Sequence, residues 1–291
     1  MRLVSYNTQY GFGRDGKNDL ARIAGAVRGA DVIALQEVER HWKRTGYADQ
    51  AAEIARLLPD YHWVYGPGAD MDASIPGPDG KPLHRRRQFG NMLLSKTPIV
   101  TSRNHMLPKF GTQTQYSLQR CALEGVIAAG SSALRVYSIH LTHLSDESRA
   151  PQVERILDIH ARAFSEGGAW CGGHPTDSAW TEGGEPPMPR EAVMMGDFNF
   201  PPTSPLYARI VGPRSPEYGR MNNRDGFVDA WVVTGHGEHE GVTCDSGTLN
   251  TGKRIDYCYV SATLRPKIKS ARIDNDAAGS DHQPIWTELD L

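Results

Sequence analysis

Short runs of apolar or alternating residues, each as long as a β-strand, recur along the whole sequence. Between some of them the apolar residues have the spacing of an amphipathic helix, most clearly at 18–28, 47–58 and 150–164. Strands that alternate with helices early and dominate later favour a layered α/β (α+β) fold over an all-β sandwich or a helical bundle. The expected strands are residues 2–6, 31–36, 91–95, 121–128, 134–140, 192–195, 255–260 and 285–289.

Two segments interrupt this pattern, at about 66–87 and 165–189, where glycine, proline and polar residues support neither strand nor helix periodicity. Both are predicted to be long loops. An interdomain linker is the alternative, but the apolar strand that begins at Ala192 needs neighbours from the first half of the chain. We therefore expect residues 1–291 to form a single domain, a size that one large hydrophobic core can support.

The composition argues against several classes of protein. The 32 basic and 34 acidic residues leave a formal charge of −2, so the whole molecule should not attract nucleic acid strongly. The four cysteines are far apart and include no C-x-x-C pair, which is typical of reduced thiols. Residues 1–6 resemble a strand with no signal segment before it, and no run of about 18 apolar residues occurs. We therefore expect a cytoplasmic protein without stable membrane insertion.

The segment 195–202 contains the most specific local motif, in which an apolar strand leads directly into Asp197, Asn199 and a proline turn. Residues two apart in an extended chain project to the same side, so this carboxylate and carboxamide should point together. Such a pair suits the positioning of a water nucleophile. The alternative is a turn in which both side chains only bind their own backbone.

A second polar cluster, residues 279–284, precedes the apolar strand at 285–289. Its His282 belongs to the residue type best suited to donating protons near neutral pH, and the carboxylate of Asp281 suits Mg²⁺. A capped loop without function is the alternative.

Four further polar residues lie at or within expected strands. Asn7, Glu37 and His140 each follow an apolar run, whereas Asp256 lies inside one. A buried charge without a partner is costly, so Asp256 needs a partner, and His282 would serve.

Taken together, these motifs resemble the endonuclease/exonuclease/phosphatase superfamily, which includes DNase I-like nucleases, neutral sphingomyelinases and inositol polyphosphate phosphatases. They span nearly the whole chain in the family's order, which makes the set far more specific than any one motif. The matching segments are S-Y-N-T from Ser5, A-L-Q-E-V from Ala34, G-N-M-L-L-S from Gly90, S-I-H-L-T-H-L from Ser138, G-D-F-N from Gly196, R-I-D-Y from Arg254 and S-D-H from Ser280.

The resemblance implies a four-layer αββα sandwich, in which two packed mixed β-sheets are flanked by helices. It also implies a divalent-metal-dependent hydrolase of phosphoric esters. Glu37 would be the main metal ligand, with Asn7 beside it and Asp281 contributing to the same site. Mg²⁺ is the expected ion, and Mn²⁺ would substitute for it.

The remaining motif residues would have catalytic roles by the same resemblance. Asp197 would orient or deprotonate the attacking water, and Asn199 would hold the water or the phosphate. His140 and His282 would contact the non-bridging phosphate oxygens. Asp256 would pair with His282, fix its ring and favour its protonated form.

The substrate is less constrained. The segment 139–144 is similar to a bacterial, sphingomyelinase-like branch, and the near-neutral charge favours a small or lipid-derived phosphodiester over nucleic acid. Arg85, Arg87 and His143 are candidate substrate contacts, although the run 85–87 also fits a solvated basic turn. A phosphomonoesterase acting on a sugar or inositol phosphate is the alternative. A non-catalytic binding module is disfavoured by the full set of catalytic residue types.

Four further residues are weaker candidates for functional contacts. Trp170 and Trp180 in the second long segment suit either an apolar substrate or an incidental position in a mobile loop. Arg120 directly precedes an expected strand and His174 lies in the second irregular segment, and neither is assigned a role. The sequence indicates no obligate protein partner.

Overall fold

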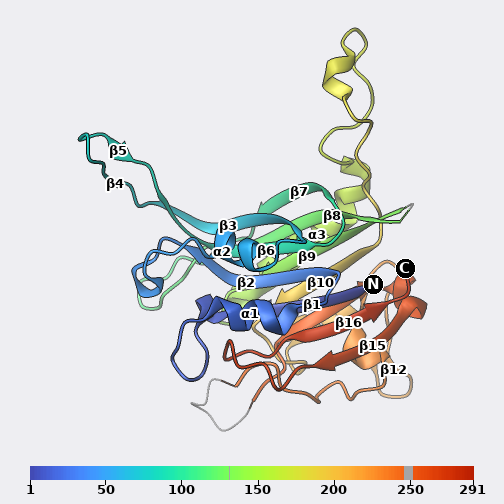
Figure 1. Ribbon diagram of the computed structural model, residues 1–291. Coiled ribbons are helices and arrows are strands. Elements are labelled where there is room, and N and C mark those ends of the chain that lie inside the picture. The colour runs from blue at the N-terminus through green and yellow to red at the C-terminus, as the bar shows by residue number, and fades with distance from the viewer. Residues whose placement is uncertain (131, 246–251) are drawn as a thin grey trace.

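Two six-stranded mixed sheets pack face to face in the computed structural model, which describes residues 1–130, 132–245 and 252–291 (Figure 1). The first sheet contains, in spatial order, β15 (Ile268–Ile273), β16 (Ile285–Leu289), β1 (Arg2–Asn7), β2 (Val32–Arg40), β6 (Arg86–Ser95) and β3 (His62–Asp72). The second contains β13 (Phe227–Asp229), β14 (Asp256–Ser261), β10 (Ala192–Asp197), β9 (Ser132–His140), β8 (Cys121–Ala129) and β7 (Ile99–Met106).

Helices cover the outer faces of the sheets. The first sheet carries α1 (Leu20–Val27) and α2 (Gln50–Leu57), and the second carries α3 (Asp146–Glu166) and α4 (Pro205–Val211). The short α5 (Ala230–Val233) follows β13. The αββα architecture expected from the sequence is therefore confirmed.

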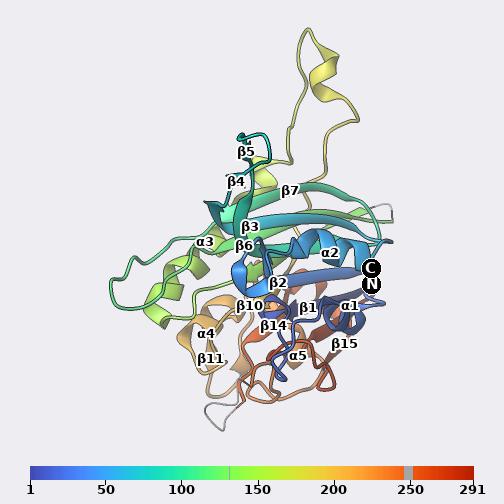
Figure 2. The same ribbon diagram turned by 60° about the vertical axis from the view of Figure 1, so that its left-hand side comes forward.

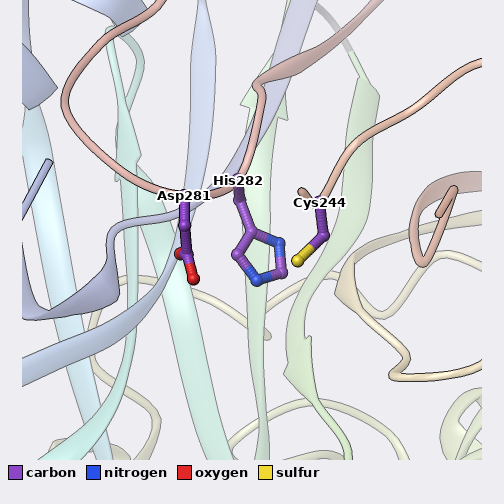
Figure 3. Close-up of side chains that lie close together, drawn as sticks. All are labelled: Cys244, Asp281 and His282. Atoms are coloured by element: carbon purple, nitrogen blue, oxygen red, sulfur yellow. The ribbon is translucent and has the colours of Figure 1, made fainter. Parts of the chain in front are cut away.

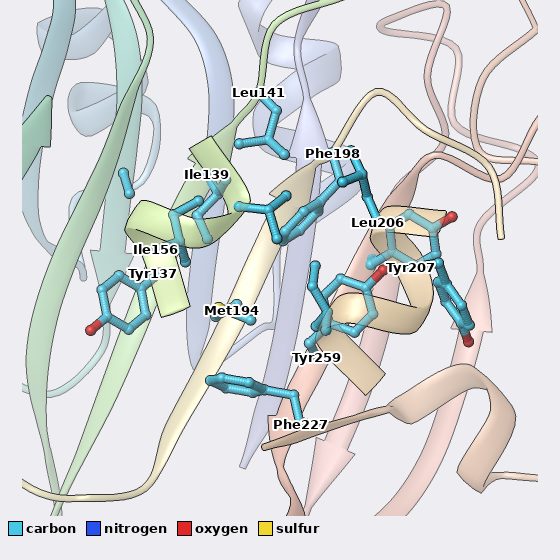
Figure 4. Packing of buried hydrophobic residues seen from close by; sticks show 14 of the residues in the cluster. Tyr137, Ile139, Leu141, Ile156, Met194, Phe198, Leu206, Tyr207, Phe227 and Tyr259 are labelled. Carbon is cyan, nitrogen blue, oxygen red and sulfur yellow. The ribbon is translucent and has the colours of Figure 1, made fainter. Parts of the chain in front are cut away.

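The central strands are apolar on both sides because each sheet is covered on both faces, and successive residues of a strand point to opposite faces. Leu3 of β1 and Val193 of β10 lie in the core between the sheets, whereas Val4 packs under α1 and α2. Met194 faces α3 and α4. Between the second sheet and these helices it lies in one hydrophobic cluster with Ile156 and several aromatic residues (Figure 4). A sheet buried on both faces requires such continuous apolar strands.

The predicted helices are confirmed, with boundaries set by their caps. The side chain of Asp19 accepts hydrogen bonds from the first turn of α1. Ser145 forms a capping box with Ser148, so α3 begins at Asp146. The sequence pattern places the start later, at residue 150.

The segment 66–87 differs from the loop expected from the sequence. β3 extends to Asp72 and β6 begins at Arg86, which makes most of the segment a long hairpin that ends in β4 (Ile75–Pro76) and β5 (Pro82–Leu83). Pairing between distant residues, including an ion pair between Arg86 Nε and Asp70 Oδ1 (2.8 Å), offsets the glycine and proline content.

The second predicted loop, residues 165–189, is mostly irregular. It begins in the last two residues of α3 and contains a single 3₁₀ turn at Ser178–Thr181. In both views this segment and the β4–β5 hairpin extend beyond the sheets (Figures 1 and 2). Among the described residues, no helix is both long enough and apolar enough to cross a membrane.

Candidate active site

The polar residues singled out in the sequence meet at one edge of the two packed sheets. β1 runs parallel to β2, and β9 runs parallel to β10, so the carboxyl ends of these four strands lie on the same side. β14 and β16 are antiparallel to their neighbours and therefore begin at that side. Within the second sheet Asp197 lies directly between His140 and Asp256 in register.

A hydrogen bond connects the two sheets at this edge. Asn7 Nδ2, at the end of β1, donates to Asp197 Oδ2 (3.0 Å), at the end of β10. Both side chains are almost completely buried. The site therefore depends on the packing of one sheet against the other, and neither sheet contains it alone.

A β-bulge directs Glu37 into the site. The pairing between β2 and β6 shifts register between Leu35 and Val38, and Glu37 within this shift has a φ of 59°. A left-handed conformation at a residue other than glycine is strained and is concentrated at functional sites. Burial raises the pKa of Glu37, and Arg120 and His282 oppose the rise.

Asp197 and Asn199 form a turn, as one of the two interpretations of the sequence expects, and their side chains also contact each other. Asp197 Oδ1 accepts a hydrogen bond from the backbone N–H of Asn199 (2.8 Å), as in a turn. Asn199, with a φ of 56°, also directs its side-chain amide to Asp197 Oδ2 (3.2 Å) and to the carbonyl of Leu141 (3.0 Å). Gly196 makes the turn possible, because a Cβ there would lie 1.9 Å from the carbonyl oxygen of Ile139.

Asp197 has an unusual affinity for protons. Burial raises the pKa of this carboxyl to about 7, with a further contribution from Asp256 and opposition from His282. A carboxylate with a pKa near neutrality is suited to exchange protons during turnover.

His282 and Asp256 form a buried pair. His282 Nδ1 lies 2.8 Å from Asp256 Oδ2, and Nε2 then points toward Asp197 Oδ2 at 3.9 Å. Burial alone would lower the pKa of His282, but the charge and hydrogen bond of Asp256 outweigh it and raise the pKa well above its ordinary value. His282 is therefore an imidazolium near neutral pH.

His140 has the opposite protonation. Arg120 Nη1 lies 2.9 Å from His140 Nδ1, and because a guanidinium only donates, Nδ1 must accept. The ring proton is then on Nε2, which lies 3.4 Å from Asp197 Oδ2 and 3.8 Å from Glu37 Oε1. Burial and the Arg120 charge lower the pKa of His140 well below its ordinary value.

Arg120 was a weak candidate in the sequence, yet it is buried and determines the tautomer of His140. Its one sequence signal is its position directly before β8, at a strand boundary like the other site residues.

A model of the Endonuclease/Exonuclease/phosphatase family matches residues 4–282. The chain belongs to this family. Solved structures with the same fold include a family protein from Beutenbergia cavernae (21% identity, TM-score 0.66, covering 100% of this chain and 71% of that one). The mannosyl-6-phosphatase of Bacteroides thetaiotaomicron has 16% identity and a TM-score of 0.62, with 100% of both chains covered. Truncated TDP2 from Caenorhabditis elegans has 19% identity and a TM-score of 0.53, covering 99% of this chain and 97% of that one. None of the curated protein sequences matches the chain.

Membership of the endonuclease/exonuclease/phosphatase family makes the protein a metal-dependent hydrolase of phosphoric esters. The oxygen donors at the site fit a hard divalent cation. The Glu37 side chain retains 19% exposure, and Asp281, whose charge further raises the pKa of Glu37, is partly exposed. Asn7 Oδ1 accepts one hydrogen bond, from the N–H of Gln9 (3.0 Å), and keeps a second lone pair. Carboxylate and carboxamide oxygens are the ligands that Mg²⁺ prefers.

The expected substrate contacts have different neighbours in the structure. His143 Nδ1 lies 3.5 Å from Arg120 Nη2 and so adjoins the site through that residue. Arg85 and Arg87 instead lie over the rings of Tyr47 and Trp42, in the segment that follows β2. A role for these two arginines in binding substrate stays a prediction.

Proposed function

We propose that this family member is a phosphodiesterase that cleaves a P–O bond in a small, lipid-derived or nucleic-acid diester by attack of water. The observation that carries the proposal is the arrangement around Asp197 Oδ2. Asn7 and Asn199 donate to this oxygen, and the ring nitrogens of His140 and His282 face it at 3.4 and 3.9 Å.

In the proposed reaction Asp197 orients the water and accepts its proton. Its pKa of about 7 makes the carboxylate a stronger base than an ordinary aspartate. The amides of Asn7 and Asn199 fix the carboxylate in place, so that little reorganisation is needed when the water attacks.

The two histidines have complementary roles. The imidazolium of His282 and the neutral N–H of His140 donate to the non-bridging oxygens, on which negative charge accumulates in the transition state. Asp256 and Arg120 act behind them as positioning residues, each fixing one protonation state. Glu37, Asn7 and Asp281 would hold Mg²⁺, with Mn²⁺ as a substitute, and the ion supplies Lewis-acid neutralisation of the phosphate.

The charge of the donors supports a diester. Near neutral pH a phosphate monoester carries about 1.5 to 2 negative charges, whereas a diester carries about one. Of the two histidines, only His282 is cationic. The guanidinium of Arg120 is hydrogen-bonded to His140 and so is not directed at the phosphate. Such a set matches a singly charged group better than a doubly charged one.

An open cleft beside the acidic residues provides space for the alcohol portion of the substrate. Its volume is about 660 Å³, and its lining includes Asp281, Tyr10, Phe12, Arg14 and Arg44. Aromatic rings and guanidinium groups suit a small organic leaving group that is flat or anionic.

Comparison of two chromogenic substrates tests the proposal. Bis-p-nitrophenyl phosphate and p-nitrophenyl phosphate are offered with Mg²⁺, with Mn²⁺ and with EDTA. Metal-dependent hydrolysis with higher kcat/KM for the diester is expected. Higher kcat/KM for the monoester would overturn the diesterase proposal in favour of a phosphomonoesterase acting on a sugar or inositol phosphate.

We also propose that residues 1–291 form one domain. The support is the dependence of the site on both sheets, through the hydrogen bond between Asn7 and Asp197. Cooperative loss of both sheets in a single thermal transition is expected.

A further inference from the structure

A cysteine thiol lies beside the imidazole of His282. Cys244, Asp281 and His282 each present one ligand atom, and these three atoms all lie within 4.8 Å of one another (Figure 3). Cys244 has no role in the proposed hydrolysis, and its spacing from the other cysteines predicts only a reduced thiol.

Backbone hydrogen bonds hold the thiol in this position. Cys244 forms isolated antiparallel bridges with both Lys253 and His282. Its N–H donates to the carbonyl of Lys253 and its carbonyl accepts from the N–H of Lys253, both at 2.9 Å. On the other side the N–H of Gln283 donates to the carbonyl of Thr243 at 2.6 Å. The cluster is therefore built into a short ladder.

Two of the three ligand atoms, the sulfur of Cys244 and a ring nitrogen of His282, differ in kind from the oxygen donors around Glu37. Thiolate and imidazole are ligands of Zn²⁺ and of softer ions such as Cd²⁺, whereas Mg²⁺ prefers oxygen. Three protein ligands, with a fourth position left for water, are a common arrangement for zinc. The chemistry of Cys244 and His282 thus selects a different class of cation from that of Glu37 and Asn7.

Asp256 supplies the support that a metal-binding histidine needs. It holds His282 Nδ1 at 2.8 Å, which leaves Nε2 as the nitrogen for a metal. A carboxylate on the far ring nitrogen is the usual accompaniment of a histidine ligand, because it fixes the ring and increases its basicity. Asp256 and His282 are both almost completely buried, so the imidazole cannot turn away easily.

We propose that Cys244, Asp281 and His282 form an inhibitory site for Zn²⁺ and other thiophilic divalent cations. On binding, the thiol of Cys244 loses its proton to solvent and His282 Nε2 gives up the proton that faces Asp197. Asp281 is withdrawn from the oxygen-ligand site at the same time. Metal binding at the cluster stands independently of the proposed function, whereas inhibition rests on it.

Direct binding is tested first, with the full-length protein in Mg²⁺ buffer. Titration with Co²⁺ or Cd²⁺ should produce a thiolate-to-metal charge-transfer absorption that saturates at one equivalent and is displaced by Zn²⁺. Cys171 is an exposed free cysteine, so Cys171→Ser is the matched control and should keep the absorption. Cys244→Ser and Cys244→Ala should abolish it, with unchanged far-ultraviolet circular dichroism as the check on folding.

Inhibition is measured on Mg²⁺-supported hydrolysis of bis-p-nitrophenyl phosphate, with each variant compared with its own zinc-free rate. The Zn²⁺ concentration for half-inhibition should rise at least about tenfold in Cys244→Ser, because one of three ligands is lost, and should not change in Cys171→Ser. A charge-transfer absorption that persists in Cys244→Ser, or an unshifted half-inhibition, would overturn the proposal. Metal binding without hydrolysis of any substrate would count against the phosphodiesterase alone, and hydrolysis without binding against this site alone.

Discussion

Replacing Asp256 with asparagine should show how the buried pair contributes to catalysis. The change keeps the approximate shape of the side chain but removes the charge that raises the pKa of His282. Burial then disfavours the imidazolium, and the ring becomes neutral near pH 7 with its one proton on Nδ1, which the amide oxygen introduced at position 256 accepts, so Nε2 no longer donates. Loss of one preorganised donor to a developing oxyanion costs about 2.7–4 kcal/mol, so kcat should fall roughly 10²- to 10³-fold.

The assay is the kcat and KM of bis-p-nitrophenyl phosphate hydrolysis at saturating Mg²⁺. KM should change little, because the lost interaction strengthens only in the transition state. His282→Ala should lose a similar factor, and the double variant should lose little more, since the two residues act as a unit. Additive losses in the double variant, with melting temperatures unchanged, would refute the pairing as the source of the effect.

Three further predictions concern other parts of the molecule. Glu37→Ala should abolish Mg²⁺-dependent hydrolysis while the protein stays folded, and full activity would remove Glu37 from the metal site. Deletion within 165–189 should spare bis-p-nitrophenyl phosphate but reduce hydrolysis of the natural substrate; equal losses on both would make the segment structural. Burial and the Arg135 charge lower the pKa of His160 from 6.5 to about 4, and its Nδ1 accepts from Arg135 Nη2 (2.8 Å). Since the folded pKa is depressed, the contribution of His160 to the free energy of unfolding should be constant above about pH 6.5 and fall by up to about 3 kcal/mol as the pH drops to about 4. In denaturant titrations His160→Gln should flatten the fall over this interval, and an unchanged slope would exclude His160 as its cause.

Strand periodicity and family resemblance predicted the central strands and the edge at which the site lies. Asn7, His140 and Asp197 end their strands in the structure, as their positions after apolar runs indicate. Edge strands were harder to predict. β7 and β15 have largely exposed, polar faces, and the hairpin at 66–87 depends on pairing between residues that are distant in sequence.

The electrostatic arrangement of the site could not be read from the sequence. Arg120 meets His140 because β8 pairs with β9, and the resulting tautomer follows from that register rather than from any motif. Cys244 likewise reaches His282 only through a bridge between two irregular segments. Both contacts depend on tertiary packing, which composition and spacing do not encode locally.

In the proposed reaction, Asp197 orients the attacking water and accepts its proton at the junction of the two sheets. The most direct measurement is the Mg²⁺-dependent rate of bis-p-nitrophenyl phosphate hydrolysis by Asp197→Asn beside the original protein, with EDTA as the blank. We predict a loss of at least about 10³-fold in kcat in a variant that retains its fold, because asparagine cannot accept the proton of the attacking water. Retention of most of the rate would contradict the account.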